Sequence, residues 1–132
     1  MTYAGLGILN TSIASTGYAL VRTTNRLELR STHMPRSRPV FVDFVGGSTG
    51  FRRMTGQSRN QPLARAVGVK GEAPYVIDAT AGLGRDSFLL ACLGCRVLMI
   101  ERSAALGALL ADGLARACGA SAALDRILER LT

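Results

Sequence analysis

The 132-residue sequence lacks the features that define several protein classes. No apolar run approaches the ~18 residues that a membrane-spanning helix requires, and no basic segment precedes the apolar stretch at the N-terminus, as a secretory signal would need. Cysteine is scarce, and its three residues form no even set for a disulfide framework. These absences favour one small cytoplasmic domain that contacts no membrane.

Side chains that bind metal ions are also few. His33 is the only histidine, and Cys92 and Cys95 form a single C-x-x-C without a second pair, whereas zinc usually needs four ligands. We expect Cys92 at the C-terminal end of a helix, where a thiolate gains no stabilisation. The sequence therefore predicts no metal and no redox role, and the cysteines are expected to pack as small hydrophobic residues.

Lysine is nearly absent, because fifteen of the sixteen basic residues are arginine. Residues 1–70 contain ten basic and two acidic residues, whereas residues 71–132 contain six and seven. Arginine binds phosphate through two N–H groups at once. The basic first half therefore suggests a polyanionic partner and the second half a small ligand, although solubility alone explains such a charge as well.

Turn and periodicity signals divide the sequence into three regions. Residues 1–47 are predicted to form a small β-rich N-terminal subdomain, with a hairpin of strands 18–21 and 27–30 and a further strand at 40–45. Residues 48–74 are predicted to form a basic loop and a short helix. That helix is expected to have Asn60 as its cap, Pro62 in its first turn and Gly68 after its end.

The third region, residues 75–132, alternates strands with helices. The predicted strands are 75–78 and 96–100, and the predicted helices are 85–93, 104–117 with Ser103 as its cap, and a last one from Ser121 to about Leu131. This order indicates a parallel sheet with right-handed crossovers. The predicted fold class is α/β, with a partial Rossmann-like sheet after the β-rich subdomain.

A strand, a glycine-containing turn and a helix start follow one another between Tyr75 and Asp86. The strand ends in Asp78, and the next strand ends in Glu101, so both acids are expected at the carboxyl edge of the sheet, where α/β proteins bind nucleosides. Gly82 and Gly84 lack a Cβ and allow close approach of a ligand. We expect Asp78 either to fix the loop or to bind the ammonium group of a cofactor through water, and Glu101 to accept hydrogen bonds from the ribose hydroxyls.

Two strand-end acids favour S-adenosylmethionine over a dinucleotide. A NAD site requires G-x-G-x-x-G/A directly after the strand, but the sixth position from Gly82 is Ser87, and Asp78 would repel a pyrophosphate. S-adenosylmethionine has a cationic methionyl end that an acid attracts. A NAD-dependent oxidoreductase and a plain strand-to-helix turn without a ligand remain as alternatives.

Several segments together resemble the 16S ribosomal RNA guanine-N2 methyltransferases of the RsmJ type. In chain order they are F-V-D-F-V-G-G at 41–47, Arg52-Arg53, A-R-A-V-G-V-K-G at 64–71, D-A-T-A-G-L-G-R-D at 78–86, G-C-R-V at 94–97 and Glu101-Arg102. The resemblance covers residues 40–116 and extends weakly to 27–30. It implies a Rossmann-like S-adenosylmethionine-dependent methyltransferase that modifies a guanine of the small ribosomal subunit.

The resemblance also implies site residues. By analogy, the Arg-Asp pair after the glycine turn and the Glu-Arg pair after the second strand contact the cofactor, and here these are Arg85, Asp86, Glu101 and Arg102. An RNA-backbone patch is expected from basic residues before the first strand of the sheet, although a solvated basic loop is the simpler explanation. Its members are Arg52, Arg53, Arg59, Arg65 and Lys70.

The sequence departs from the family at one important feature. Family members continue for roughly another hundred residues, which include an Asp-Pro turn that positions the guanine amine. None of the four prolines here follows an aspartate. We therefore expect an inactive N-terminal portion of the enzyme, with apolar surface and an open sheet edge available for self-association. A non-catalytic RNA-binding remnant is the alternative.

Overall fold

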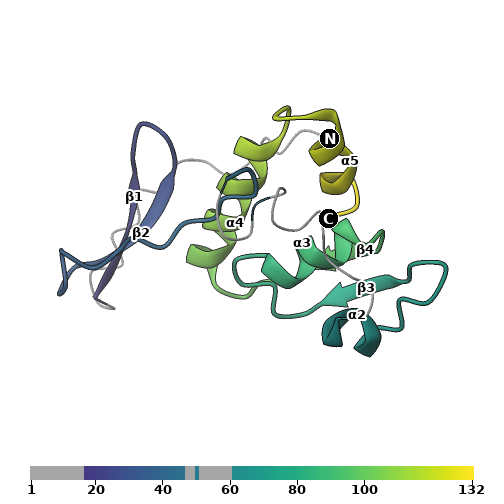
Figure 1. The fold of residues 1–132 in the computed structure, drawn as a ribbon. Coiled ribbons are helices and arrows are strands. Elements are labelled where there is room, and N and C mark those ends of the chain that lie inside the picture. The colour runs from purple at the N-terminus through teal and green to yellow at the C-terminus, as the bar shows by residue number, and fades with distance from the viewer. Residues whose placement is uncertain (1–16, 47–49, 51–60) are drawn as a thin grey trace.

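The structure is a computed structural model, and it describes residues 17–46, 50 and 61–132. In chain order its elements are β1 (Tyr18–Arg22), β2 (Leu27–Ser31), α2 (Pro62–Ala66), β3 (Tyr75–Asp78), α3 (Arg85–Cys92), β4 (Arg96–Met99), α4 (Ala104–Ala117) and α5 (Ala122–Leu128). Within these ranges β1 and β2 form an antiparallel hairpin, and β3 and β4 pair in parallel. In Figure 1, α4 lies between the hairpin and the parallel pair.

The predicted order of strands and helices in the third region is confirmed. Helix α3 connects two parallel strands, which is the unit of an α/β sheet. Ser103 and Ser121 cap α4 and α5, because their hydroxyls accept the N–H groups of Leu106 and Leu124. The hairpin is also confirmed, with Leu20 opposite Leu29.

One hydrophobic cluster joins the sheet, the helices and the segment after the hairpin. Helix α3 contributes Phe88, whose ring centroid lies 4.7 Å from that of Phe44, and β4 contributes the fully buried Val97. Helices α4 and α5 add buried side chains at helical spacing, among them Leu109, Leu110, Leu114, Leu124 and Ile127. Leu20, Leu27 and Leu29 of the hairpin pack against this cluster, so the same core positions both sheets.

The predicted strand at 40–45 is wrong beyond its first residue. Val40 pairs with Leu29 in a single antiparallel bridge, and the chain then turns. The turn forms because the Asp43 carboxylate accepts the N–H groups of Val45 and Gly46, both at 3.0 Å. The β-branched and aromatic residues that suggested a strand pack into the core from this turn instead, since Val42 and Phe44 are both buried.

Two predicted helix boundaries also need correction. Helix α2 begins after Gln61, which makes no side-chain cap hydrogen bond, and Asn60 lies outside the described residues. Helix α5 ends at Leu128 rather than Leu131. Residues 130–132 instead run parallel to β4, with the Val97 N–H donating to Arg130 O at 2.8 Å and the Thr132 N–H to Val97 O at 3.0 Å. This segment therefore covers part of the sheet edge that was predicted to be open.

Candidate functional site

The ends of β3 and β4 lie side by side, and the loop of residues 79–84 crosses them. The Ile100 N–H donates to Asp78 O at 2.8 Å, and the Ala81 N–H donates to Ile100 O at 3.0 Å. These two hydrogen bonds continue the parallel pairing past the last ladder residues. The structure therefore brings Asp78, the glycine turn and Glu101 to one edge of the sheet.

Asp78 fixes the loop and the start of α3. One carboxylate oxygen accepts the Thr80 N–H at 3.1 Å, and the other accepts the Ser87 hydroxyl at 2.5 Å. Ser87 is fully buried in the first turn of α3, so its hydrogen bond ties the strand end to the helix. Of the two roles considered for Asp78, the structure displays the loop-fixing one.

Glu101 connects the second strand to the same loop. Its Oε2 accepts the Gly82 N–H at 2.8 Å, and its Oε1 accepts the Ser103 N–H at 2.7 Å. The hydrogen bonds from Ser103 and then Gly82 lower the pKa of Glu101 below its ordinary value. The ionised carboxylate can accept further hydrogen bonds at each oxygen, so it can hold the loop and still receive two hydroxyl groups.

The two glycines of the turn have different surroundings, although both have positive φ values, +55° at Gly82 and +73° at Gly84. A Cβ on Gly82 would meet only Thr80 O, at 3.8 Å, so a ligand can approach the backbone there. A Cβ on Gly84 would lie 2.6 Å from Leu110 Cδ1 and 3.2 Å from Phe44 Cζ. The expectation of ligand access therefore fits Gly82, whereas Gly84 is required for packing.

The charged pairs predicted from the resemblance surround this edge. Arg85 and Asp86 are exposed in the first turn of α3, and Arg102 is exposed directly after Glu101. The helix N-terminus adds backbone N–H groups that have no partner within the helix. Two carboxylates, an accessible glycine backbone and N–H donors suit a nucleoside with a cationic substituent. A pyrophosphate would instead face the Asp78 carboxylate.

The predicted RNA patch is only partly described. Arg65, in the last turn of α2, and Lys70 are exposed, and with Pro62 and Ala66 they line one shallow surface hollow. Arg52, Arg53 and Arg59 lie outside the described residues. The structure thus brings two of the five predicted basic residues together.

The buried serine was missed because a serine in a helix gives no functional signal by itself. The one available signal is its position nine residues after the strand-end acid. This spacing places Ser87 in the first turn of α3, from which its hydroxyl donates to Asp78. The two cysteines of the C-x-x-C pack as expected, because Cys95 is fully buried and burial raises the pKa of the Cys92 thiol to about 11, whereas Cys118 is exposed. Within the described ranges no acidic, cysteine or histidine side chains cluster as metal ligands do, and no helix is long and apolar enough to cross a bilayer.

Comparison with known proteins identifies the family. Residues 7–132 match a family described as "Putative SAM-dependent methyltransferase". Ribosomal RNA small subunit methyltransferase J of Nitrosococcus oceani is 60% identical over 99 residues, which are 74% of this chain and 38% of that protein. The Edwardsiella ictaluri protein of the same name is 53% identical over 115 residues, or 86% of this chain and 46% of that protein.

A solved structure agrees with these relatives. The crystal structure of a SAM-dependent methyltransferase from Neisseria gonorrhoeae superposes with a TM-score of 0.70 at 33% identity, over 88% of this chain and 46% of that one. The chain therefore spans less than half the length of the relatives it matches. The partial Rossmann-like fold and the resemblance to RsmJ-type enzymes are confirmed, and the chain belongs to the family of SAM-dependent methyltransferases.

Proposed function

We propose that the chain forms the cofactor-binding part of an S-adenosylmethionine-dependent enzyme that methylates N2 of a guanine in 16S ribosomal RNA. The double hydrogen bonding of Glu101 to Gly82 and Ser103 is the main support, because it places an ionised carboxylate between the two strand ends, where α/β proteins bind nucleosides. The names of the relatives, which are ribosomal RNA small subunit methyltransferases, support the substrate. The compartment of such a substrate is the cytoplasm.

In this proposal each site residue has a distinct role. Glu101 accepts the ribose hydroxyls, and Gly82 leaves room for the adenosyl group. Asp78 holds the loop and places negative potential near the methionyl ammonium. Arg85, Asp86 and Arg102 contact the outer parts of the cofactor, where exposed donors and acceptors can adjust to it.

Transfer to a guanine amine also needs an acceptor-side group. The amine lone pair is delocalised into the ring, so an oxygen must accept its N–H while the nitrogen lies in line with the S–CH₃ bond. The 132 residues contain no Asp-Pro turn for this purpose. We infer that this polypeptide binds RNA through Arg52, Arg53, Arg59, Arg65 and Lys70 but transfers no methyl group by itself.

Titration calorimetry with S-adenosylhomocysteine, NAD and a 16S ribosomal RNA fragment tests the proposal. We expect S-adenosylhomocysteine to bind and Glu101→Gln to weaken that binding at least tenfold. The amide would present its NH₂ to one of the two backbone donors and would lack the charge that hydroxyl groups prefer. Glu129→Gln, an exposed glutamate after α5, is the matched control.

Other ligand preferences in this titration would favour other functions. Binding of NAD without S-adenosylhomocysteine would support the oxidoreductase, and binding of RNA alone would support a non-catalytic RNA-binding protein. Methyl transfer to the RNA fragment by the 132-residue polypeptide would contradict the inferred inactivity and leave the cofactor site intact.

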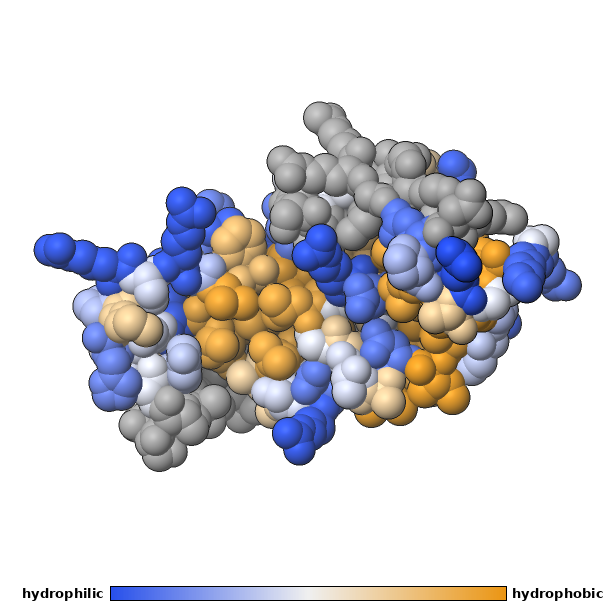
Figure 2. Space-filling view, turned by 60° about the horizontal axis from the view of Figure 1, so that its bottom comes forward, coloured by the Kyte–Doolittle hydropathy of each residue, from blue (hydrophilic) through white to orange (hydrophobic). Residues whose placement is uncertain are grey.

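The parallel sheet also supports self-association. Tyr75, Ile77 and Ile100 are 58%, 58% and 48% exposed. By strand alternation they share one face of the sheet with Leu98 and with Arg96, which is exposed at its edge. Parallel sheets are normally covered on both faces. Figure 2 shows hydrophobic surface on the right, at the end of the molecule that holds this sheet. We infer that, in solutions of the 132-residue polypeptide, a second copy covers this face.

A charge on the uncovered face should prevent this association. We expect the parent protein to form dimers or larger species as its concentration rises, and Ile77→Glu to stay monomeric, because a carboxylate cannot be buried unpaired. Light scattering after size-exclusion chromatography measures the mass. Met34→Glu, which replaces another exposed apolar residue in the loop after the hairpin, should associate like the parent. A monomeric parent would contradict the inference.

A further inference from the structure

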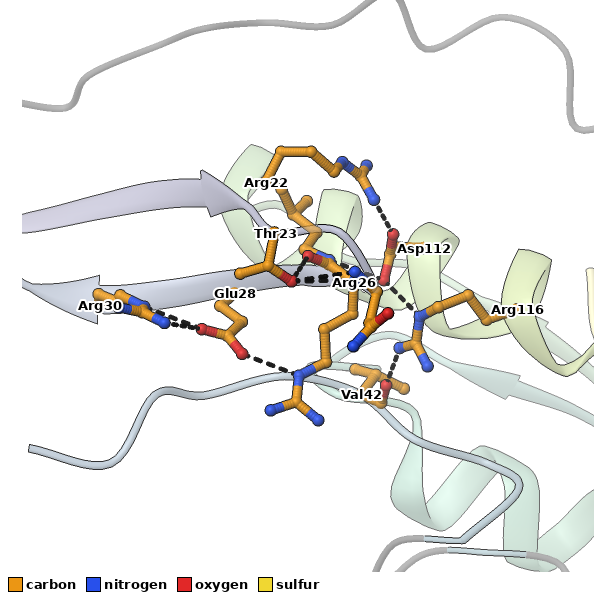
Figure 3. Close-up of polar contacts among 10 residues, drawn as sticks. Arg22, Thr23, Arg26, Glu28, Arg30, Val42, Asp112 and Arg116 are labelled. Atoms are coloured by element: carbon orange, nitrogen blue, oxygen red, sulfur yellow. Dashed lines mark hydrogen bonds and ion pairs between the residues drawn. The ribbon is translucent and has the colours of Figure 1, made fainter.

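The hairpin contains a buried carboxylate between two arginines. The Glu28 side chain is only 4% exposed. Its Oε1 accepts the Arg26 Nε–H at 2.8 Å, and its Oε2 accepts from Arg30, through Nε at 2.8 Å and Nη2 at 2.7 Å. Figure 3 shows both guanidiniums extending from this one carboxylate. We call Arg26, Glu28 and Arg30 the hairpin clamp.

The clamp holds its arginines in fixed orientations. Arg26 also lies over the Phe41 ring, with its Cζ 3.4 Å from the ring centroid, which is a cation–π contact. Hydrogen bonds from Arg30 and then Arg26 lower the pKa of Glu28, so the carboxylate stays ionised. A free arginine loses side-chain entropy when it binds a partner, and these two have already lost much of it.

The exposed charge of this region is positive. The arginine side chains of the clamp are 34% and 52% exposed, whereas Glu28 is buried beneath them. Arg36 and Arg38, in the loop that follows β2, are exposed as well. On the left of Figure 2, hydrophilic side chains project from the hairpin end of the molecule. An approaching ligand therefore meets guanidinium groups before it meets a carboxylate.

We propose that the hairpin clamp is a docking site for the phosphate backbone of RNA, with Arg26 and Arg30 as the phosphate ligands and Glu28 as their positioning residue. The choice of RNA rests on the proposed function. The outward N–H groups of two oriented guanidiniums match adjacent phosphate oxygens. The Arg26 guanidinium occupies one face of the Phe41 ring, and the contacts that we assign are to phosphate groups alone, so we expect binding that is independent of base sequence.

This site differs from the RNA patch predicted from the sequence. That patch includes Arg65 in the last turn of α2 and Lys70 shortly after it, whereas the clamp lies on the hairpin. In Figure 1, α4 separates the hairpin from the sheet. Two separate basic sites can hold one long RNA at two points. The hairpin then acts as an anchor at a distance from the reacting base, as expected for an enzyme whose substrate is a large folded RNA.

A charge-matched pair of variants tests the proposal. The triple variant Arg26→Gln, Glu28→Gln, Arg30→Gln removes one net positive charge and leaves no buried charge in the hairpin. Arg126→Gln, on an exposed side chain of α5, removes the same net charge elsewhere. Fluorescence anisotropy with a labelled 16S ribosomal RNA fragment should show affinity about tenfold lower for the triple variant and nearly unchanged for the control. The slope of log K against log salt should fall by about 1 to 2.

Three results would overturn the proposal. One is equal loss of affinity in the triple variant and in Arg126→Gln, since net charge alone would then explain binding. The single variant Glu28→Gln retains both arginines but no longer holds their side chains in place, so we expect it to bind RNA about threefold more weakly than the parent. Tighter RNA binding by this variant is the second result. Poly-glutamate of equal charge serves as a second polyanion. The last result is a triple variant that binds poly-glutamate more weakly than the parent but binds RNA equally well. S-adenosylhomocysteine binding by the folded triple variant should equal that of the parent, which separates this test from that of the cofactor site.

Discussion

Gly84→Ala should unfold at a much lower urea concentration than the parent protein and bind no measurable S-adenosylhomocysteine. Gly84 has φ +73°, and a non-glycine residue in the left-handed region costs roughly 1–2 kcal/mol. Its new Cβ would lie 2.6 Å from Leu110 Cδ1 and 3.2 Å from Phe44 Cζ, and overpacking of this kind costs roughly 1–3 kcal/mol. We expect a total loss of about 3 kcal/mol in the free energy of unfolding, measured by urea denaturation.

Gly68→Ala separates the two contributions. Gly68 has nearly the same backbone, with φ +77°, but nothing lies within 4 Å of a Cβ placed there. It should therefore lose only the conformational part, about 1 kcal/mol, and bind S-adenosylhomocysteine like the parent. Equal losses in the two variants would mean that Leu110 and Phe44 move aside easily and that packing against Gly84 does not hold the turn.

Much of the α/β region follows from local signals in the sequence. Ser103 and Ser121 precede apolar residues at helical spacing, and each hydroxyl accepts an N–H in the first turn of its helix. A hydroxyl cap of this kind depends on neighbouring residues alone, so it can be predicted without knowledge of the fold. The same holds for the strand of residues 75–78, since an apolar run between glycine-rich segments has few alternatives.

One failure arises where a long-range contact decides the conformation, and another where a local side-chain hydrogen bond does. Leu131 continues the helical spacing from Ile127, and it is buried as that pattern predicts, but it lies in an extended segment. The free edge of β4 attracts this segment, because unpaired strand N–H and C=O groups gain hydrogen bonds from it. The second failure is the turn near residue 43. There the Asp43 carboxylate accepts the Val45 N–H and ends an apolar segment that otherwise resembles a strand.

The candidate site was predictable in position and incomplete in detail. Parallel strands bring their carboxyl ends together, so two strand-end acids suffice to locate Asp78 and Glu101. The partners of these acids depend on how the loop closes. Ser87 and the Ser103 N–H complete the hydrogen bonding of the two carboxylates. Neither contact was predicted from the sequence, although Ser103 was predicted as a helix cap. The different surroundings of Gly82 and Gly84 likewise come from Leu110 of α4 and from Phe44, which are both distant in sequence from the turn.

Asp112→Ala should detach the hairpin from α4. The Asp112 side chain is 6% exposed. It accepts the Arg116 Nε–H at 2.8 Å, the Leu27 N–H at 3.1 Å and a hydrogen bond from Arg22, and Arg116 in turn donates to Val42 O (Figure 3). Without the carboxylate the Leu27 N–H has no acceptor there and two guanidiniums lose their counter-ion. We expect a loss of about 2–3 kcal/mol in the free energy of unfolding, with Glu129→Ala nearly unchanged.

The pH dependence of this loss identifies its cause. Burial acts to raise the pKa of Asp112, but the hydrogen bonds from Arg116, Leu27 and Arg22 outweigh it and lower the pKa below its ordinary value. A lowered pKa in the folded state stabilises the protein above the unfolded pKa of about 3.9, and this contribution disappears as the pH falls through the folded value. The difference between parent and Asp112→Ala should therefore be constant from pH 5 to 7 and shrink below about pH 4. A difference that persists at pH 2 would mean that packing, not the ionised carboxylate, joins the hairpin to α4.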